Sequence, residues 1–433
     1  MVFQYLSLEV DNVNVVWICN VPNSELSKSL DSKVVSGGWI EGALNPIRKR
    51  NGFNIIYIWA NSNVNTVKKK TINNHVYYLL PKCNKKDKLM MYFNSIFDNL
   101  IIDLVHIWGT EYLHSAICLE ICEQFNIKYV ISIQGLIANC ALAYNIKIPF
   151  SVIYKFSLVE LIRRNTLTNQ IKSFISNGIT ERELIKKAKY IIGRTNWDRE
   201  NILSINKKIH YYHCNENLRS SFYQAKKWNI NECEKNSIFV SQASYPLKGF
   251  HVLLYALSIV REDIPDITVY VAGYDIIKRN DIKSRILKSS YARYISKLIR
   301  SLNLENNIRF LGPLEEKEMI VYYLKTNIFC NCSLMENSSN SLSEAMILGV
   351  PVISSYVGGI PSLAENDSNT FFYCAYDYLH LAALIKKLLL DTDVQNQMSK
   401  NNILRAELRH NIDSNTDKLL SIYKEILFGR SIK

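Results

Sequence analysis

Two glutamates, Glu336 and Glu344, have the spacing in this sequence that most suggests chemistry. The run 328–361 around them reads as strand, loop, helix, strand and glycine loop, with seven residues between the two carboxylates. Glu336 is expected in the loop after the first strand and Glu344 one turn into the helix. Both should therefore lie at the carboxyl edge of a parallel sheet, where open α/β sheets bind ligands.

The helix start between the two glutamates offers free backbone N–H groups and the positive end of the helix dipole, which favour a phosphate. Carboxylates beside an anion site suit neutral hydroxyls, so the pattern predicts a sugar or ribose that carries a phosphate. Lys248 and Gly249, in a loop between a strand and a helix, place an ammonium and N–H groups at one point, which suits a diphosphate. Gly37 and Gly38 fit a phosphate-facing turn, and a tight turn without a ligand is an equal alternative.

Polar residues also follow the predicted strands of the first half of the chain. His106 and Glu111 belong to the segment DLVHIWGTEY, Gln134 and Gly135 follow the next strand, and Arg194 follows a third. Because parallel strands end at one edge, these residues are expected to collect there and to line a cleft. A satisfied core position for His106 and a salt bridge for Arg194 are the structural alternatives.

The composition predicts a two-domain α/β protein with an anionic partner. The chain has 433 residues, 48% of them hydrophobic, and strands alternate with helices, which indicates doubly wound parallel sheets. The net charge of +13 favours a nucleotide sugar or an anionic membrane surface. No signature of a nucleic-acid-binding motif is present, so no nucleic acid is expected as a partner.

The location and the absence of a cofactor are further expectations. Ten cysteines without a leading signal peptide or a zinc-site spacing suggest reduced thiols and a cytoplasmic protein, and no metal is expected. No apolar run is long enough to span a bilayer, so any work at the inner face of the cytoplasmic membrane would be peripheral. The apolar, aromatic and basic stretch 138–165 reads as core helix or as an amphipathic membrane face, and core is favoured.

With these motifs in order, the chain resembles the retaining GT-B glycosyltransferases of the family-4 type. The resemblance rests on the E-x7-E pair, its flanks EAMILGVPVISS and YVGGIP, the glycine pair, SIQG, the lysine loop and RFLG. It implies a GT-B architecture: two Rossmann-like doubly wound parallel-sheet domains facing across a cleft, with a C-terminal helix returning to the first domain. The expected divisions are an acceptor-side domain at 1–214, a nucleotide-sugar domain at 215–410 and the returning helix at 411–433.

The resemblance also implies site residues. It assigns catalysis to Glu336, Lys248 and His106, with Glu336 at the donor sugar and Glu344 at the ribose. The expected donor-binding residues are Gly37, Gly38, Gln242, Lys248, Gly312, Glu336, Asn337, Ser338, Ser339, Asn340, Ser341, Leu342 and Glu344, and the expected acceptor-side residues are His106, Glu111, Gln134, Gly135 and Arg194.

Three departures from the family pattern stand out. Gln242 replaces the usual arginine before the lysine loop, Gln134 replaces a histidine, and Asn337, Ser338 and Ser339 replace a glycine-phenylalanine-glycine run.

The function implied is that of a retaining hexosyltransferase. It would move a sugar from a nucleotide-diphosphate donor to a glycan or lipid-linked acceptor, without a cofactor other than the donor. The segments GRTNWD and SQASYPLKG resemble bacterial enzymes of capsule, exopolysaccharide or O-antigen assembly. The alternative is a catalytically inactive partner subunit that binds a sugar nucleotide.

Overall fold

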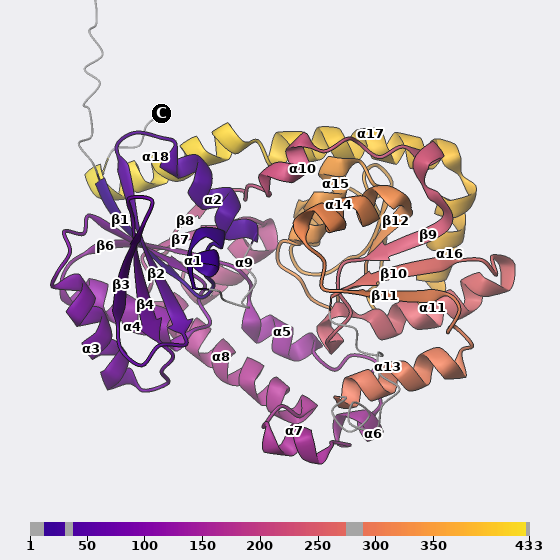
Figure 1. The fold of residues 1–433 in the computed structure, drawn as a ribbon, viewed down its shortest axis with the longest axis horizontal. Coiled ribbons are helices and arrows are strands. Elements are labelled where there is room, and N and C mark those ends of the chain that lie inside the picture. Colours follow the sequence, from indigo (N-terminus) through magenta and orange to yellow (C-terminus); the bar gives the residue numbers. More distant parts are fainter. Residues whose placement is uncertain (1–12, 31–37, 274–288, 430–433) are drawn as a thin grey trace, which may run out of the picture.

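The computed structural model describes residues 13–30, 38–273 and 289–429. It contains two parallel sheets, each in its own α/β domain, and the domains lie side by side along the long axis of the molecule (Figure 1). This confirms the predicted architecture of two doubly wound domains.

The first sheet has eight strands in the order β3-β4-β2-β1-β5-β6-β7-β8. All neighbours are parallel except β3, which pairs antiparallel with β4 at one edge. The strand order reverses between β1 and β5, which makes this the point where a ligand is expected. The strands are β1 Val13–Cys19, β2 Phe53–Ser62, β3 Lys68–Ile72, β4 His75–Pro81, β5 Leu104–Trp108, β6 Lys128–Ser132, β7 Tyr190–Gly193 and β8 His210–His213.

The second sheet has six parallel strands in the order β11-β10-β9-β12-β13-β14. Its order reverses between β9 and β12, so the loops after these two strands should flank a ligand. The strands are β9 Glu234–Val240, β10 Thr268–Ala272, β11 Ile308–Gly312, β12 Thr326–Asn331, β13 Val352–Ser355 and β14 Phe371–Tyr373.

Helices cover both faces of each sheet. Those of the first domain are α1 Ser24–Ser29, α2 Gly38–Arg48, α3 Lys86–Phe97, α4 Leu113–Gln124, α5 Ile137–Ala143, α6 Phe150–Ile153, α7 Leu158–Ile162, α8 Leu167–Lys187 and α9 Asn196–Ile205. Those that follow are α10 Ser220–Gln224, α11 Phe250–Asp263, α13 Ser290–Ser301, α14 Glu316–Lys325, α15 Asn340–Leu348, α16 Tyr378–Leu390, α17 Thr392–Arg409 and α18 Ile412–Phe428.

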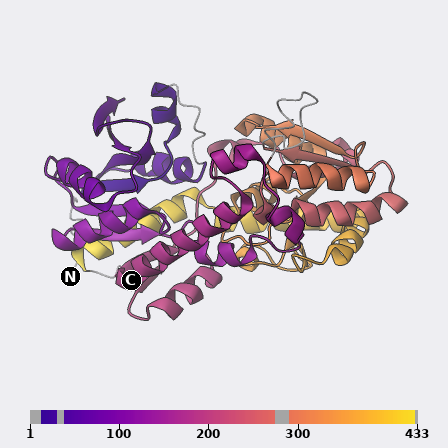
Figure 2. The same ribbon diagram turned by 90° about the horizontal axis from the view of Figure 1, so that it is seen from below.

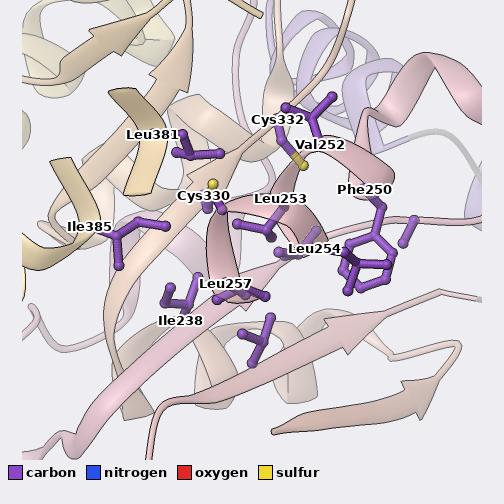
Figure 3. Close-up of a cluster of buried hydrophobic side chains, with 14 of the residues drawn as sticks. Ile238, Phe250, Val252, Leu253, Leu254, Leu257, Cys330, Cys332, Leu381 and Ile385 are labelled. Atoms are coloured by element: carbon purple, nitrogen blue, oxygen red, sulfur yellow. The ribbon is translucent and has the colours of Figure 1, made fainter. Parts of the chain in front are cut away.

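An apolar cluster fixes the strands that end at the second switch point. Ile238 of β9 and Cys330 of β12 pack against Leu253 and Leu257 of α11, and Leu381 of α16 covers the same cluster (Figure 3). These side chains are fully buried or nearly so. Because close packing of buried apolar groups holds neighbouring elements in one arrangement, the loops after β9 and β12 are held close together.

The last helix returns to the first domain, as predicted. In Figure 1, α17 and α18 run from the second domain to the first along one side of the molecule. Leu419, Tyr423 and Ile426 of α18 join the buried cluster that contains Trp17 of β1. The chain therefore closes by packing its C-terminal helix on the domain in which it began.

One local expectation needs correction. The stretch 138–165 is not mainly core, because it forms three short helices that leave Leu142, Phe150 and Ile162 exposed by 76 to 82%.

Candidate active site

Lys248 and Glu336 meet at the switch point of the second sheet. Lys248 follows β9 and Glu336 follows β12, which are the two strands where the order reverses. Lys248 Nζ lies 2.8 Å from Glu336 Oε2, and each side chain is 22% exposed. Burial opposes the charge on Lys248, but Glu336 and Tyr245 outweigh this and raise the pKa of Lys248 above its usual value. The result is an ion pair that solvent still reaches.

Gly249 explains why the lysine loop can approach Glu336 so closely. Its φ is +63°, and a Cβ there would lie 1.8 Å from the carbonyl oxygen of Cys332. Only glycine fits such a conformation and contact without displacing the backbone. The loop after β9 is thereby held against the end of β12.

The start of α15 lies between the two glutamates, as the sequence predicts. Ser339 caps the helix by accepting a hydrogen bond from the N–H of Leu342. Asn337 Oδ1 accepts a 2.9 Å hydrogen bond from Thr195 of the first domain. Asn337 Nδ2 and Asn340 Oδ1 are buried without a hydrogen-bond partner in the described part of the chain. Buried polar atoms are usually paired, so these two could contact a bound ligand.

Glu344 makes a two-point contact with an arginine that the sequence analysis missed. Arg219 Nε and Nη2 lie 3.0 and 2.7 Å from Glu344 Oε1. Burial raises the pKa of Glu344, and Arg219 opposes that rise. The side chain of Arg219 also covers Gly38, where a Cβ would lie 2.8 Å from Arg219 Cδ. Arg219 therefore links the start of α2 in the first domain to α15 in the second.

Three other predicted donor residues, Gln242, Gly312 and Ser341, make hydrogen bonds within the second domain. Gln242 donates a hydrogen bond from Nε2 to Ser244 Oγ. Gly312 ends β11 with φ +80° and has open space beside it, and Gly273 donates to its carbonyl. The carbonyl of Ser341 accepts a hydrogen bond from Tyr323. Gly37 lies outside the described residues.

The structure places His106 in the core of the first domain and not at the sheet edge, which is the structural alternative that the sequence left open. It lies within β5, fully buried, with Nε2 2.7 Å from Ser132 Oγ and Nδ1 bonded to Tyr423 of α18. Its ring stacks on Trp108 at 4.1 Å. Burial lowers the pKa of His106 well below its usual value. This corrects the prediction of a catalytic sheet-edge residue, because both ring nitrogens are occupied inside the core.

Gln134 and Arg194 do come together at the edge of the first sheet. Arg194 Nη2 donates to Gln134 Oε1 at 2.7 Å and to the carbonyl of Ile133. Arg194 is 6% exposed, so it supports the loop more than it faces solvent. Gly135, next in the chain, has no neighbour within 4 Å of where a Cβ would stand.

Glu216, which was also not predicted from the sequence, lies at the junction of the two domains. Its Oε1 accepts a hydrogen bond from Ser338 Oγ. Burial alone would raise its pKa, but Arg409, Arg194 and His410 outweigh burial and lower the pKa of Glu216 to about 2. The carboxylate thus remains charged in a buried basic surrounding. The sequence signal was weak, because this residue lies in an aperiodic segment.

Helix α5 of the first domain lies near the loop that carries Glu336. Burial raises the pKa of Cys140 in α5 to about 12, and the charges of Glu336, Glu181, Lys248 and Glu111 also act on this thiol. Cys140 and Met335, the residue before Glu336, pack against the same buried apolar cluster, so α5 lies near the loop that carries Glu336.

Glu181 of α8 fixes the shape of this region. It accepts hydrogen bonds from Thr110 Oγ1 and from the N–H groups of Ile137 and Ala138, at 2.9 to 3.2 Å. Burial raises the pKa of Glu181 to about 7 against these hydrogen bonds. Burial also raises the pKa of Glu111, which accepts from the N–H of Thr110.

Comparison with protein-family models finds a match in the second domain. Residues 221–405 match the family model described as Glycosyl transferases group 1. The match covers less than half of the 433 residues. Spore coat protein SA of Bacillus subtilis (strain 168) is 25% identical over 196 residues, covering 44% of this chain and 49% of that protein. The chain spans about half the length of the curated relatives it matches.

Similarity to solved structures extends over almost the whole chain. A sucrose-phosphate synthase from Thermosynechococcus elongatus superposes with a TM-score of 0.70 at 16% identity, over 96% of this chain and 100% of that chain. HepE of Anabaena, in complex with UDP-glucose, superposes with a TM-score of 0.65 at 14% identity, over 95% and 99% of the two chains. The chain has the GT-B fold.

Two further findings concern metals and membranes. Among the residues that the structure describes, no group of three or more His, Cys, Asp or Glu side chains could hold a metal ion. None of the described helices is long and apolar enough to cross a bilayer.

Proposed function

We propose that this protein is a glycosyltransferase that moves a sugar from a nucleotide-diphosphate donor to a glycan or lipid-linked acceptor, with retention of the anomeric configuration. The observation that carries the proposal is the Lys248 and Glu336 pair at the switch point, beside the N-terminus of α15. It is supported by the group 1 match of the second domain and by a GT-B neighbour that binds UDP-glucose.

In this proposal the donor lies on the second domain. Lys248 and the N–H groups at the start of α15 meet the diphosphate, whose negative charge grows as the sugar departs. Glu336 is released from Lys248 and holds hydroxyls of the donor sugar, and its charge stabilises the positive character that develops on the ring. Glu344 meets the ribose and exchanges part of its contact with Arg219 for hydrogen bonds to the ribose hydroxyls.

The acceptor is proposed to enter from the first domain. Glu111 follows β5, and Gln134 and Gly135 follow β6, which are the strands at and beside the first switch point. We place the protein in the cytoplasm at the inner face of the membrane, in the assembly of capsule, exopolysaccharide or O-antigen. No metal or nucleic acid takes part.

A donor screen tests the proposal. The protein is incubated with UDP-, GDP-, ADP- and dTDP-sugars and an acceptor extract, and released nucleoside diphosphate is measured. We expect release with one class of donor, abolished in the double variant Lys248→Ala, Glu336→Ala, and a product with retained configuration by NMR. No release with any donor would reject catalysis, and an inverted product would reject the proposed stereochemistry.

The alternative is an inactive subunit that binds a sugar nucleotide. It is favoured by Gln242, whose neutral amide donates to Ser244 where the family pattern has an arginine. Calorimetric binding of a nucleotide sugar without turnover, and turnover only after a second protein is added, would support this alternative.

A further inference from the structure

Large apolar side chains are exposed along one part of the first domain. Among the described residues, eight of the nineteen large apolar side chains that are exposed fall within positions 142–179. Five of them lie on and between α6 and α7, which project at the lower edge of the molecule in Figure 1 and belong to the side seen in Figure 2. We call these five the α6–α7 face: Phe150, Tyr154, Phe156, Leu161 and Ile162. Such a concentration marks an interaction surface.

The same segment is basic. Lys147, Lys155, Arg163, Arg164 and Lys172 are all exposed. The one carboxylate between positions 138 and 180 is that of Glu160, which is buried.

Glu160 is occupied within the protein. Its two oxygens accept hydrogen bonds from the N–H and the hydroxyl of Ser290, and Arg293 lies 3.3 Å away. The outer surface of the segment therefore carries cations and apolar groups together, without an exposed acid to balance them.

A cavity beside the α6–α7 face collects more positive charge. It lies between α6 and α13, has a volume of about 510 Å³, and is lined by the cations Lys155, Arg293 and Lys297, by Ser151, Ser290 and Ser301, and by Pro149, Val152, Tyr294 and Leu298. None of the lining residues is acidic. Hydroxyl groups and ammonium groups in one hollow suit a phosphate.

The α6–α7 face is tied to both domains. Glu160 connects α7 to α13 in the second domain, and His251 of α11 bonds to the carbonyl of Ile146 just before α6. Upstream, the chain passes through α5, where Cys140 packs against the same buried cluster as Met335, the residue before Glu336. A ligand held at the face would thus lie at the outer end of a segment whose inner end borders the proposed site.

We propose that the α6–α7 face binds the surface of an anionic phospholipid bilayer, with the aromatic side chains in the headgroup region and Lys155 and Lys297 at lipid phosphates. Apolar insertion and attraction to anionic lipid act together in peripheral binding, and long basic side chains keep their charges in the interface. A lipid surface fits better than a protein partner because exposed cations and exposed apolar groups occur together in this segment, whose carboxylate, Glu160, is buried. The inference deepens the proposed function by naming the membrane surface for its lipid-linked acceptor, and rests on that function only for this purpose.

Vesicle flotation tests the inference with the full chain. Vesicles of phosphatidylcholine alone are compared with vesicles that also contain phosphatidylglycerol. Two double variants alter the surface: Phe150→Ser with Tyr154→Ser, and Lys155→Glu with Lys297→Glu. Controls on α14 and α17 are Leu404→Ser with Leu408→Ser, and Lys317→Glu with Lys400→Glu, which change exposed apolar and basic residues elsewhere.

We expect the unaltered protein and both controls to bind anionic vesicles, and each surface variant to bind them at least tenfold more weakly. Salt should weaken binding, and inorganic phosphate at equal ionic strength should not compete more than chloride. Absence of binding, equal binding to both vesicle types, or equal losses in the controls would overturn the inference.

Donor binding separates this inference from the proposed function. Calorimetric affinity for the nucleotide sugar should be unchanged in the surface variants, because their side chains lie outside the donor residues. Vesicle binding without donor binding would reject the proposed transferase and support the membrane surface. Donor binding without vesicle binding would support the transferase and reject the membrane surface.

Discussion

At the scale of single residues, Lys248 has two partners in the proposed reaction. Without a donor it is paired to Glu336 at 2.8 Å, and with a donor it would meet the diphosphate. Because the two side chains are paired, neither charge lacks a counter-ion in this partly buried site. It also means that removing the lysine leaves Glu336 as an unbalanced negative charge beside the phosphates.

We expect Lys248→Ala to weaken nucleotide-diphosphate binding and turnover together. Loss of a charge-assisted contact costs about 1.5 to 3 kcal/mol, or roughly 10- to 100-fold. Calorimetry with the donor and steady-state kinetics measure both effects. Lys400→Ala, which changes an exposed lysine on α17, serves as the control. Unchanged donor affinity and rate would remove Lys248 from the site.

The two glutamates should respond differently to substitution. Glu344 is proposed to meet the ribose, which does not change during reaction, so Glu344→Ala should mainly raise the donor KM. Glu336 is proposed to meet the reacting sugar, so Glu336→Ala should lower kcat more than affinity. Glu336→Gln keeps the hydrogen bonding and loses the charge, so it should recover affinity better than rate.

Kinetics of these three variants decide the roles, with circular dichroism to confirm folding. Arg219→Lys is a useful companion, because it keeps a charge near Glu344 but loses the two-point contact. If Glu344→Ala abolishes kcat while Glu336→Ala raises only KM, the two roles are reversed.

At the scale of helices and strands, α18 completes the core of the first domain. Tyr423 places its hydroxyl between Trp17 Nε1, at 3.2 Å, and His106 Nδ1. All three side chains are fully buried. The returning helix therefore supplies polar partners that strands β1 and β5 need inside the core.

Tyr423→Phe keeps the ring but removes those partners. Leaving buried polar groups unpaired costs about 1 to 3 kcal/mol, so we expect a lower midpoint of thermal unfolding. Tyr356→Phe is the matched control, since Tyr356 is 62% exposed. An equal midpoint in Tyr423→Phe and the unaltered protein would show that α18 contributes only apolar packing.

The buried charge of Glu216 should make the free energy of unfolding depend on pH in the acidic range. Its pKa is lowered from 4.5 to about 2 in the folded protein, so its charged form stabilises the fold above pH 4.5. That stabilisation, up to about 3 kcal/mol by linkage, is lost as the pH falls from 4.5 toward 2.

We expect Glu216→Gln to unfold more easily than the unaltered protein at pH 7, and the difference to shrink as the pH falls below 4.5. Thermal unfolding at a series of pH values measures this. Glu262→Gln, at an exposed position of α11, should show no such difference. A gap between the two proteins that does not change with pH would contradict the charged state of Glu216.

At the scale of the whole molecule, the positive charge that the reaction needs comes from the chain itself in our proposal. Lys248, the N-terminus of α15 and closure of the two domains would stabilise the departing diphosphate together. Activity should therefore survive excess EDTA. Nucleotide release is measured before and after chelation, and loss of activity that only manganese or magnesium restores would show that a metal takes part.

The sequence predicted much of the fold because local signals and tertiary structure agree in the second domain. The helix predicted within the run 328–361 is observed as α15, where Ser339 caps its start and Gly349 ends it at φ +82°. The βαβ pattern around it placed Glu336 and Lys248 in loops, and the parallel order of β9 and β12 made those loops neighbours.

Only the tertiary structure could place His106, Arg219, Glu216 and the α6–α7 face. Whether a histidine inside a strand faces ligand or core depends on what covers it, and its cover is Tyr423, 317 residues later. Arg219 and Glu216 lie in a segment without periodicity, and their partners Glu344 and Ser338 lie 125 and 122 residues further along the chain. The pattern of 138–165 fits a core helix or an exposed amphipathic one, and the core reading that the sequence favoured is not the one observed. The sequence by itself determined the alternation, the caps and the glutamate pair, because these follow from neighbouring residues; burial and ion pairing were decided by contacts between distant ones.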